Sequence, residues 1–281
     1  MASKNILVVG GAGGVGSAVI DLLVNRGYAV ATTVLESSEA DTLQSHYGAA
    51  VKAHAVDLSN AEIALKKIKA VVDALPSLDA VVICAAIAPC GPVELTPLSA
   101  YSAAFEINCR GAVAVYQAAM PALRKTGGRI VLLSSMAGRA AFPFLSAYIA
   151  TKFALEGLGD VMRREAGPQG VKVSIIEPGG IQTNLVRQQL VDVKRGYAAL
   201  SEEDRDRYGY LYTGFLKTAD ESLRETASAP DQIAAVVLEA LDAREPESRY
   251  IAGADAKQFL EMIRTMSDRE VDTVFNQMFL A

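Results

Sequence analysis

The sequence predicts an α/β fold in which helices cover both faces of a doubly wound parallel sheet. Two observations support this prediction. Short apolar runs alternate with longer segments of helical periodicity as far as residue 176. The first apolar run also ends in a glycine-rich turn that leads directly into a helix. The length of 281 residues and the hydrophobic fraction of 51% suit one large domain, which we place at residues 1–281.

The glycine-rich turn lies between a strand expected over residues 5–9 and a helix expected over residues 17–25. Glycines let backbone N–H groups approach a pyrophosphate, and the helix N-terminus offers its positive dipole to the same group. Two spacings overlap here, G-x-G-x-x-G from residue 11 and G-x-x-G-x-x-G from residue 10. The sequence therefore predicts a Rossmann-type dinucleotide site formed by Gly10, Gly11, Gly13, Gly14, Val15 and Gly16.

The second strand, expected over residues 28–35, ends at Glu36. In dinucleotide-binding folds an acidic residue often ends this strand and binds the ribose. No arginine is near to receive a 2′-phosphate, and Glu36 would repel one. The sequence thus favours NAD over NADP, although Glu36 fits a solvated loop charge equally well.

The remaining elements continue the alternation. Strands are expected over residues 51–56, 79–84, 129–133, 171–176 and 248–252. Helices are expected over residues 38–47, over 59–75 with Ser59 as the N-cap, at intervals over 96–124, and over 146–165 and 230–243. Ligands of such folds lie beyond the carboxyl ends of the strands. Asp57, Ser135, Pro178 and Gly179 all fall at such ends.

Two C-terminal segments have a different character. Residues 185–227 are rich in charge and in tyrosine, at Tyr197, Tyr208, Tyr210 and Tyr212. Their position after the sixth strand favours a helical flap over a substrate pocket, with a surface insertion as the alternative. The tail, residues 254–281, is expected to form amphipathic helices over 256–266 and 269–279. Its apolar face needs a partner, either the core of the same chain or a second subunit.

Tyr148 and Lys152 form a candidate proton-transfer pair. They are four residues apart in the helix expected over 146–165, so they lie on one of its faces. A phenol has a pKa near ~10, and a nearby ammonium favours the phenolate and lowers that pKa. The pair therefore suits acid/base chemistry on a hydroxyl or carbonyl group. On its spacing alone, an ordinary pair on an exposed helix is the alternative.

Composition argues against several classes of function. The formal net charge of −5 and the lack of a basic run argue against a nucleic-acid partner. No apolar segment approaches the ~18 residues of a membrane span, and we expect no signal peptide. The unpatterned cysteines Cys84, Cys90 and Cys109 suit a reducing, cytoplasmic compartment. His46 and His54 offer neither a metal site nor a Ser-His-Asp triad.

Taken together, the motifs resemble those of the short-chain dehydrogenases/reductases over nearly the whole chain. Tyr148 and Lys152 match the Tyr-x-x-x-Lys motif of that family, and Ser135 lies thirteen residues before the tyrosine, where the family carries its catalytic serine. Asn108 matches the family's helix asparagine. The cofactor motifs match at Asp57, Leu58, Pro178, Gly179 and Thr183, and the resemblance adds Ala85 and Ile181 to the cofactor contacts.

The chain also departs from the family's pattern. The positions of the common Asn-Asn-Ala-Gly motif read Ile83-Cys84-Ala85-Ala86, so two asparagine side chains are missing beside the fourth strand. The glycine turn resembles that of the extended members, whereas the rest looks classical. The flap and the tail look like those of members that act on retinols and hydroxysteroids. Many of those carry an arginine that favours NADP where this chain has Leu35.

The resemblance implies reversible oxidation of a secondary alcohol to a ketone, or of a primary alcohol to an aldehyde, by hydride transfer to or from nicotinamide. It implies Tyr148 as the acid/base and Ser135 as the residue that orients the substrate oxygen. Lys152 would lower the pKa of Tyr148 and bind the nicotinamide ribose, and Asn108 would hold a water that relays protons from Lys152. The apolar loop over residues 136–145 and the tyrosine-bearing flap indicate a bulky hydrophobic substrate.

The resemblance further implies a homodimer or homotetramer, paired through the helices that contain Asn108 and Tyr148. Two other functions stay open on the sequence: a regulator that binds NAD(H) without turnover, and a nucleotide-sugar epimerase or dehydratase. The intact catalytic residues argue against the regulator. The lack of an evident second domain argues against the nucleotide-sugar enzyme.

Overall fold

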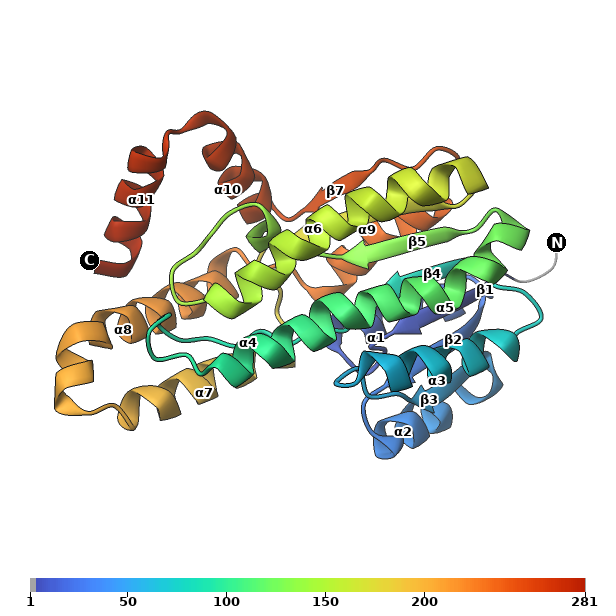
Figure 1. The fold of residues 1–281 in the computed structure, drawn as a ribbon, viewed down its shortest axis with the longest axis horizontal. Helices are drawn as coiled ribbons and strands as arrows, with labels where there is room; N and C mark the ends of the chain where they lie inside the picture. The colour runs from blue at the N-terminus through green and yellow to red at the C-terminus, as the bar shows by residue number, and fades with distance from the viewer. Residues whose placement is uncertain (1–3, 281) are drawn as a thin grey trace.

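A seven-stranded sheet runs through the centre of the molecule, in the order β3-β2-β1-β4-β5-β6-β7 (Figure 1). The computed structural model describes residues 4–280. Every neighbouring pair of strands is parallel, which confirms the predicted doubly wound parallel sheet. The strands are β1 (Asn5–Val9), β2 (Ala29–Val34), β3 (Val51–Ala55), β4 (Ala80–Ile83), β5 (Arg129–Leu133), β6 (Lys172–Pro178) and β7 (Arg249–Ala252).

Helices cover both faces of this sheet. One face packs against α1 (Gly14–Asn25) and α9 (Pro230–Asp242), and the other against α3 (Ala61–Asp73), α5 (Gly111–Thr126) and α6 (Ser146–Ala166). The central strands are apolar on both sides because both sides are covered. In β1, Leu7 and Val9 face the α5 side, whereas Ile6 and Val8 face the α1 side. The strand order reverses between β1 and β4, and the ligand crevice of such sheets lies at this point.

Local sequence sets the start of α3 differently from prediction. The predicted N-cap of α3, Ser59, is wrong, because the Asn60 side chain accepts the Ile63 N–H at 3.1 Å. Ser59 instead donates both its N–H and its hydroxyl to Asp57. The region expected to be helical at intervals contains α4 (Leu98–Phe105) and α5, joined by a π-helical turn at Glu106–Arg110.

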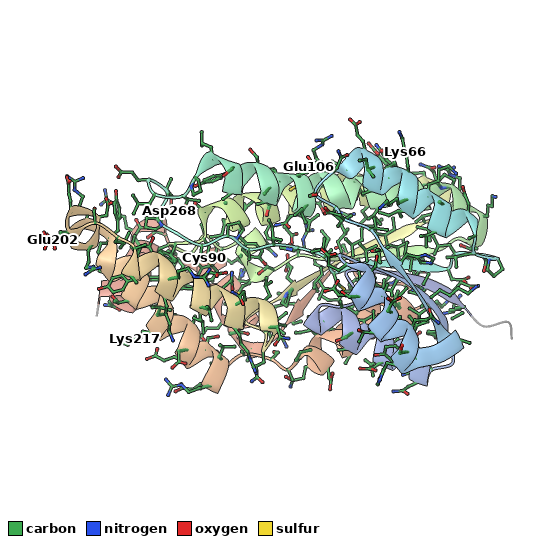
Figure 2. The ribbon with its side chains drawn as sticks, turned by 90° about the horizontal axis from the view of Figure 1, so that it is seen from below. Lys66, Cys90, Glu106, Glu202, Lys217 and Asp268 are labelled. Carbon is green, nitrogen blue, oxygen red and sulfur yellow. The ribbon has the colours of Figure 1, made fainter. Side chains whose placement is uncertain are left out.

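The C-terminal helices extend beyond the carboxyl ends of the strands. They are α7 (Asn184–Ala198), α8 (Glu202–Glu225), α10 (Ala254–Thr265) and α11 (Asp268–Leu280). The remaining helix, α2 (Ser37–Tyr47), packs beside the edge strand β3. Figure 2 marks the start of α8 at Glu202, far from Lys66 on α3. The tail packs on its own chain: α11 lies against α8, where Phe279 meets Gly214. Within residues 4–280, no helix is both long enough and apolar enough to span a membrane.

Candidate active site

A cavity of about 740 Å³ opens at the carboxyl ends of the strands. We call its two parts the cofactor end, formed by the glycine turn and the loops after β2 to β6, and the substrate end, formed by the loop after β5 and by α8, α10 and α11. Most sequence-predicted site residues line it: Gly10, Gly13, Gly14, Val15, Gly16, Asp57, Leu58, Ala85, Ser135, Tyr148, Lys152, Pro178, Gly179, Ile181 and Thr183. Gly11, Glu36 and Asn108 are not among the lining residues.

The glycine turn presents backbone to the cavity because side chains do not fit. Gly10 has a φ of 88°, and a Cβ there would lie 2.8 Å from the Ala85 backbone. A Cβ at Gly16 would lie 2.1 Å from the Gly10 carbonyl oxygen. The N-cap of α1, Gly13, has no side chain to satisfy the first N–H groups, and the first turn contains no acidic residue. These N–H groups therefore suit a pyrophosphate. Gly11 instead packs against Thr32.

An acidic residue that was not predicted from the sequence lines the cavity just after β2. Glu36 is exposed, whereas Glu39, in the first turn of α2, is half-buried and lines the cavity. One Glu39 carboxylate oxygen accepts the N–H groups of Leu35 at 3.0 Å and Glu36 at 3.1 Å. The capping-box spacing, Glu three residues after the N-cap, is the signal that could have identified it. The cavity lining thus favours Glu39 over Glu36 as the acid that faces a bound nucleotide.

The loop after β6 is tied to the chain that precedes α9. Gly180 accepts the Ser228 N–H at 2.9 Å, and the Gln182 N–H donates to the Ser228 carbonyl at 3.0 Å. Because the two flanking peptides face Ser228, the Ile181 N–H points to the opposite side. Thr183 caps α7 by accepting the Val186 N–H at 3.4 Å. Its methyl would meet a Cβ placed on Gly14 at 2.9 Å, so this loop reaches the glycine turn.

Tyr148, Lys152 and Ser135 meet at the boundary between the two ends of the cavity. Tyr148 and Lys152 lie one turn apart on α6, with the Lys152 Nζ 5.5 Å from the centroid of the Tyr148 ring. The Lys152 Nζ also donates to the Leu133 carbonyl at 2.8 Å. Ser135 follows β5, and its hydroxyl accepts the Ala137 N–H at 3.1 Å and faces the hydroxyl of Tyr148. A substrate oxygen at this point would meet two hydroxyl groups.

Burial controls the protonation of the pair in the free protein. Burial raises the pKa of Tyr148 to about 12, although the Ser135 hydroxyl lowers it. Burial also lowers the pKa of Lys152 to about 8, against smaller effects of Cys109 and Glu156 that raise it. The prediction that Lys152 sets a low pKa for Tyr148 is therefore wrong for the free protein. Each group is desolvated, and desolvation disfavours the charged form of both.

Asn108 lies behind the cavity and not in its wall. It occupies the π-helical turn, is 3% exposed, and its side chain accepts the Ile87 N–H at 2.9 Å. Its amide donates to the Ile87 carbonyl at 2.8 Å and to the Thr151 hydroxyl at 2.9 Å. Both amide hydrogens and one lone pair of the amide oxygen are therefore already used, which leaves the side chain little capacity to hold a relayed water. Asn108 thus joins the loop after β4 to α6.

The substrate end is mostly apolar and is built from segments far apart in the sequence. Its aromatic and aliphatic lining residues are Phe142, Pro143, Leu145, Phe215, Phe259, Met278 and Phe279. Phe142 makes edge contacts with Phe259 at 5.1 Å and Phe275 at 5.3 Å between ring centroids, so the loop after β5 supports the tail helices. Sequence periodicity marked these residues as apolar but carried no signal that they would converge.

The tyrosines of the flap do not line the cavity, which corrects the sequence prediction. Tyr212 is buried against Phe144, and Tyr208 donates to Glu94. Tyr210 is exposed and Tyr197 packs near Tyr212. Tyr197 and Tyr212 join α7 to α8, and Tyr208 joins α8 to the loop after β4. In that loop Cys90, labelled in Figure 2, receives a hydrogen bond from the Gln189 side chain of α7 at 3.3 Å.

Other reactive side chains offer little chemistry. Burial raises the pKa of both the Cys84 and the Cys90 thiol to about 12, so neither is a nucleophile at neutral pH. Within residues 4–280, no three His, Cys, Asp or Glu side chains come together as metal ligands would.

Comparisons with known proteins agree with this geometry. A sequence profile described as short chain dehydrogenase matches residues 4–193. The chain is 30% identical to a 3-amino-tetrahydro-pyrrolizinone reductase from Xenorhabdus hominickii, over 98% of this chain and 96% of that protein. A short-chain dehydrogenase structure from Streptomyces avermitilis superposes with a TM-score of 0.77 at 25% identity, covering 98% of this chain and 94% of the other. A short chain dehydrogenase from Burkholderia cenocepacia in complex with NADP has a TM-score of 0.73 at 21% identity, covering 97% and 96%.

Proposed function

Because the chain belongs to the short-chain dehydrogenase/reductase family and is an NAD(P)-dependent oxidoreductase, we propose that it interconverts a bulky apolar secondary alcohol and its ketone. Primary alcohols and aldehydes are included in this proposal. The observation that carries it is the meeting of Ser135, Tyr148 and Lys152 in a cavity whose other wall is the glycine turn.

The proposed division of labour follows from the contacts. Bound NAD or NADH accepts or supplies the hydride. Tyr148 takes the proton of an alcohol, or gives one to a ketone oxygen, and Ser135 donates a hydrogen bond to the same oxygen. Lys152 would hold the nicotinamide ribose hydroxyls and, when protonated, favours the phenolate of Tyr148. Asn108 holds the loop after β4 against α6.

The residues at the cofactor end fit a dinucleotide. The uncapped N-terminus of α1 suits the pyrophosphate, and Asp57 and Leu58 line the part of the cavity next to it. Glu39 would accept hydrogen bonds from the ribose and repel a 2′-phosphate, so we propose NAD as the preferred cofactor. The exposed Leu35 next to it offers no charge to a phosphate.

The proposed substrate class follows from the substrate end. Five aromatic or aliphatic side chains from α8, α10, α11 and the loop after β5 enclose it: Phe142, Phe215, Phe259, Met278 and Phe279. Such side chains gain binding free energy from apolar area, while Ser135 and Tyr148 would orient the reacting oxygen.

We also propose that the enzyme is a homodimer or homotetramer. Phe105 on α4 and Phe153 and Val161 on α6 are 39%, 45% and 49% exposed, although they are large and apolar. These helices run across the same side of the molecule (Figure 1). An apolar patch of this kind is typical of a subunit interface. Sedimentation equilibrium measures the mass directly, and a monomer at micromolar concentration would contradict the proposal.

The test of the function is turnover by wild-type protein and by Tyr148→Phe. We expect reduced-nicotinamide absorbance to rise on mixing the wild type, NAD and hydrophobic secondary alcohols. Tyr148→Phe should lower kcat by on the order of 10²–10⁴-fold, the usual contribution of a positioned acid/base, while its NADH affinity stays the same. Equal activity of the two proteins would remove Tyr148 as the acid/base.

A further inference from the structure

An acidic side chain from the C-terminal tail reaches the loop after β6. Asp255 is the second residue of α10, is 8% exposed, and lines the cavity. Its Oδ2 accepts the Gly180 N–H at 2.7 Å. Its Oδ1 is buried and has no hydrogen-bond partner among the residues that the structure describes. A buried carboxylate oxygen without a partner is costly, so packing alone does not explain an aspartate at this position.

The carboxylate fits only because glycine lies on either side of it. A Cβ at Gly179 would lie 2.1 Å from the Asp255 Oδ1, and a Cβ at Gly253 would lie 2.6 Å from the same atom. Gly253 also has a φ of 109°. Gly179 can therefore approach the Asp255 carboxylate closely, although the two residues are 76 positions apart in the sequence.

This contact adds to the hydrogen bonds that fix the loop, among them one from the Gly179 N–H to the Ala252 carbonyl at 3.0 Å. Two consecutive glycines, Gly179 and Gly180, have more backbone freedom than any other pair of residues. The Gly180 carbonyl is held by Ser228 and its N–H by Asp255, so the peptides on both sides of Gly180 are fixed. The Ile181 N–H belongs to the same peptide as the Gly180 carbonyl, so Ser228 orients it, while Asp255 fixes the peptide before it.

We propose that Asp255 is a positioning residue of the cofactor site, which holds the Gly179–Gly180 loop in the conformation that receives the nicotinamide end of NAD. The tail is then part of the cofactor end of the cavity as well as of the substrate end. This inference rests on the proposed function, because it requires that a nicotinamide nucleotide bind here.

The test compares nucleotides that do and do not reach the loop. NADH and ADP are titrated separately into wild-type protein, Asp255→Ala, Asp255→Asn and the control Asp272→Ala, which removes an exposed acid of the same tail. Asp255→Ala should weaken NADH about tenfold or more, the loss expected for a hydrogen bond to a charged group. ADP affinity should not change, because ADP ends at the glycine turn. Asp255→Asn keeps an acceptor oxygen and should restore most of the NADH affinity.

The possible outcomes separate this inference from the proposed function. Unchanged NADH affinity in Asp255→Ala would overturn the inference and leave the function standing. Equal weakening of NADH and ADP would also overturn it, because it would indicate a general structural defect. A wild-type protein that binds ADP but neither NADH nor NADPH would overturn both.

A second measurement tests the contact itself. Gly179→Ala should lower the midpoint of thermal unfolding strongly in the wild-type background, because its Cβ would clash with the Asp255 carboxylate. The same substitution combined with Asp255→Ala should lower it less than the sum of the two single effects. Additive effects would show that the two residues do not press on one another, which would contradict the proposed positioning role.

Discussion

The two ends of the cavity are built by different means. The cofactor end consists of backbone and small residues at the ends of parallel strands, where Gly10 and Gly16 leave no space for a side chain. The substrate end consists of large side chains on three helices and a loop, such as Phe142, Phe215 and Phe259. Close-packed backbone accepts few changes, whereas a wall of apolar side chains accepts changes of size at moderate cost. Cofactor chemistry is therefore fixed in this fold, and substrate choice is open to variation.

Replacing the acidic residue at the cofactor end should have the largest effect on cofactor choice. Leu35→Arg combined with Glu39→Gln should raise the preference for NADP over NAD by about a hundredfold. The substitution adds a cation that can pair with the 2′-phosphate and removes a carboxylate that repels it. The ratio of kcat/KM for the two cofactors measures the change.

The matched control neutralises the other acid. Leu35→Arg combined with Glu36→Gln carries the same arginine but leaves Glu39 in the cavity. If Glu39 is the residue that faces the nucleotide, this variant should shift the preference much less. A larger shift with Glu36→Gln would return the role to the residue predicted from the sequence.

Changes at the substrate end should affect large substrates more than small ones. Phe259→Ala removes part of the wall and its contact with Phe142, so kcat/KM for bulky alcohols should fall about tenfold while small alcohols change less. NADH affinity should stay the same. The control is Tyr210→Ala, which removes an exposed aromatic ring of α8 that does not line the cavity. If Tyr210→Ala lowers kcat/KM as much, the tyrosines of the flap contribute to binding after all.

The sequence predicted the cofactor end well for a physical reason. Parallel strands bring their carboxyl ends to one edge of the sheet, so the position of Ser135 or Pro178 along the chain also gives its position in space. The strands, the glycine turn and the Tyr148–Lys152 pair on α6 could all be located from periodicity and spacing. Glu39 was missed because it lies one turn into α2, where an acidic residue is also common as a helix cap.

The substrate end could not be predicted in the same way. Phe215, Phe259 and Phe279 belong to helices whose amphipathic faces are visible in the sequence, but no local signal states which face meets which. The tyrosine-bearing flap suggested substrate contacts for the same reason, but Tyr197, Tyr208 and Tyr212 contact neighbouring segments of the chain and Tyr210 is exposed. The pKa values of Tyr148 and Lys152 also depend on burial, which is a property of the whole fold.

The two ends of the cavity should affect stability in opposite directions. Lys152 is 2% exposed, and burial lowers its pKa from an ordinary value of 10.5 to about 8. Between these pH values the unfolded chain binds more protons than the folded protein, so this group makes the free energy of unfolding rise with pH and makes the protein least stable below pH 8.

Lys152→Met should therefore stabilise the protein at pH 7, by on the order of 2 kcal/mol after the loss of the hydrogen bond to Leu133 is subtracted. The advantage should shrink as the pH rises from about 8 towards 10. Urea unfolding of both proteins at several pH values measures it, and the effects of titrating groups that do not interact with Lys152 cancel in the difference. Phe259→Ala should change stability in the opposite direction, because it only removes apolar packing. If Lys152→Met stabilises the protein equally at pH 7 and pH 9.5, the gain comes from better packing. The buried charge of Lys152 would then not be what lowers the stability of the wild-type protein.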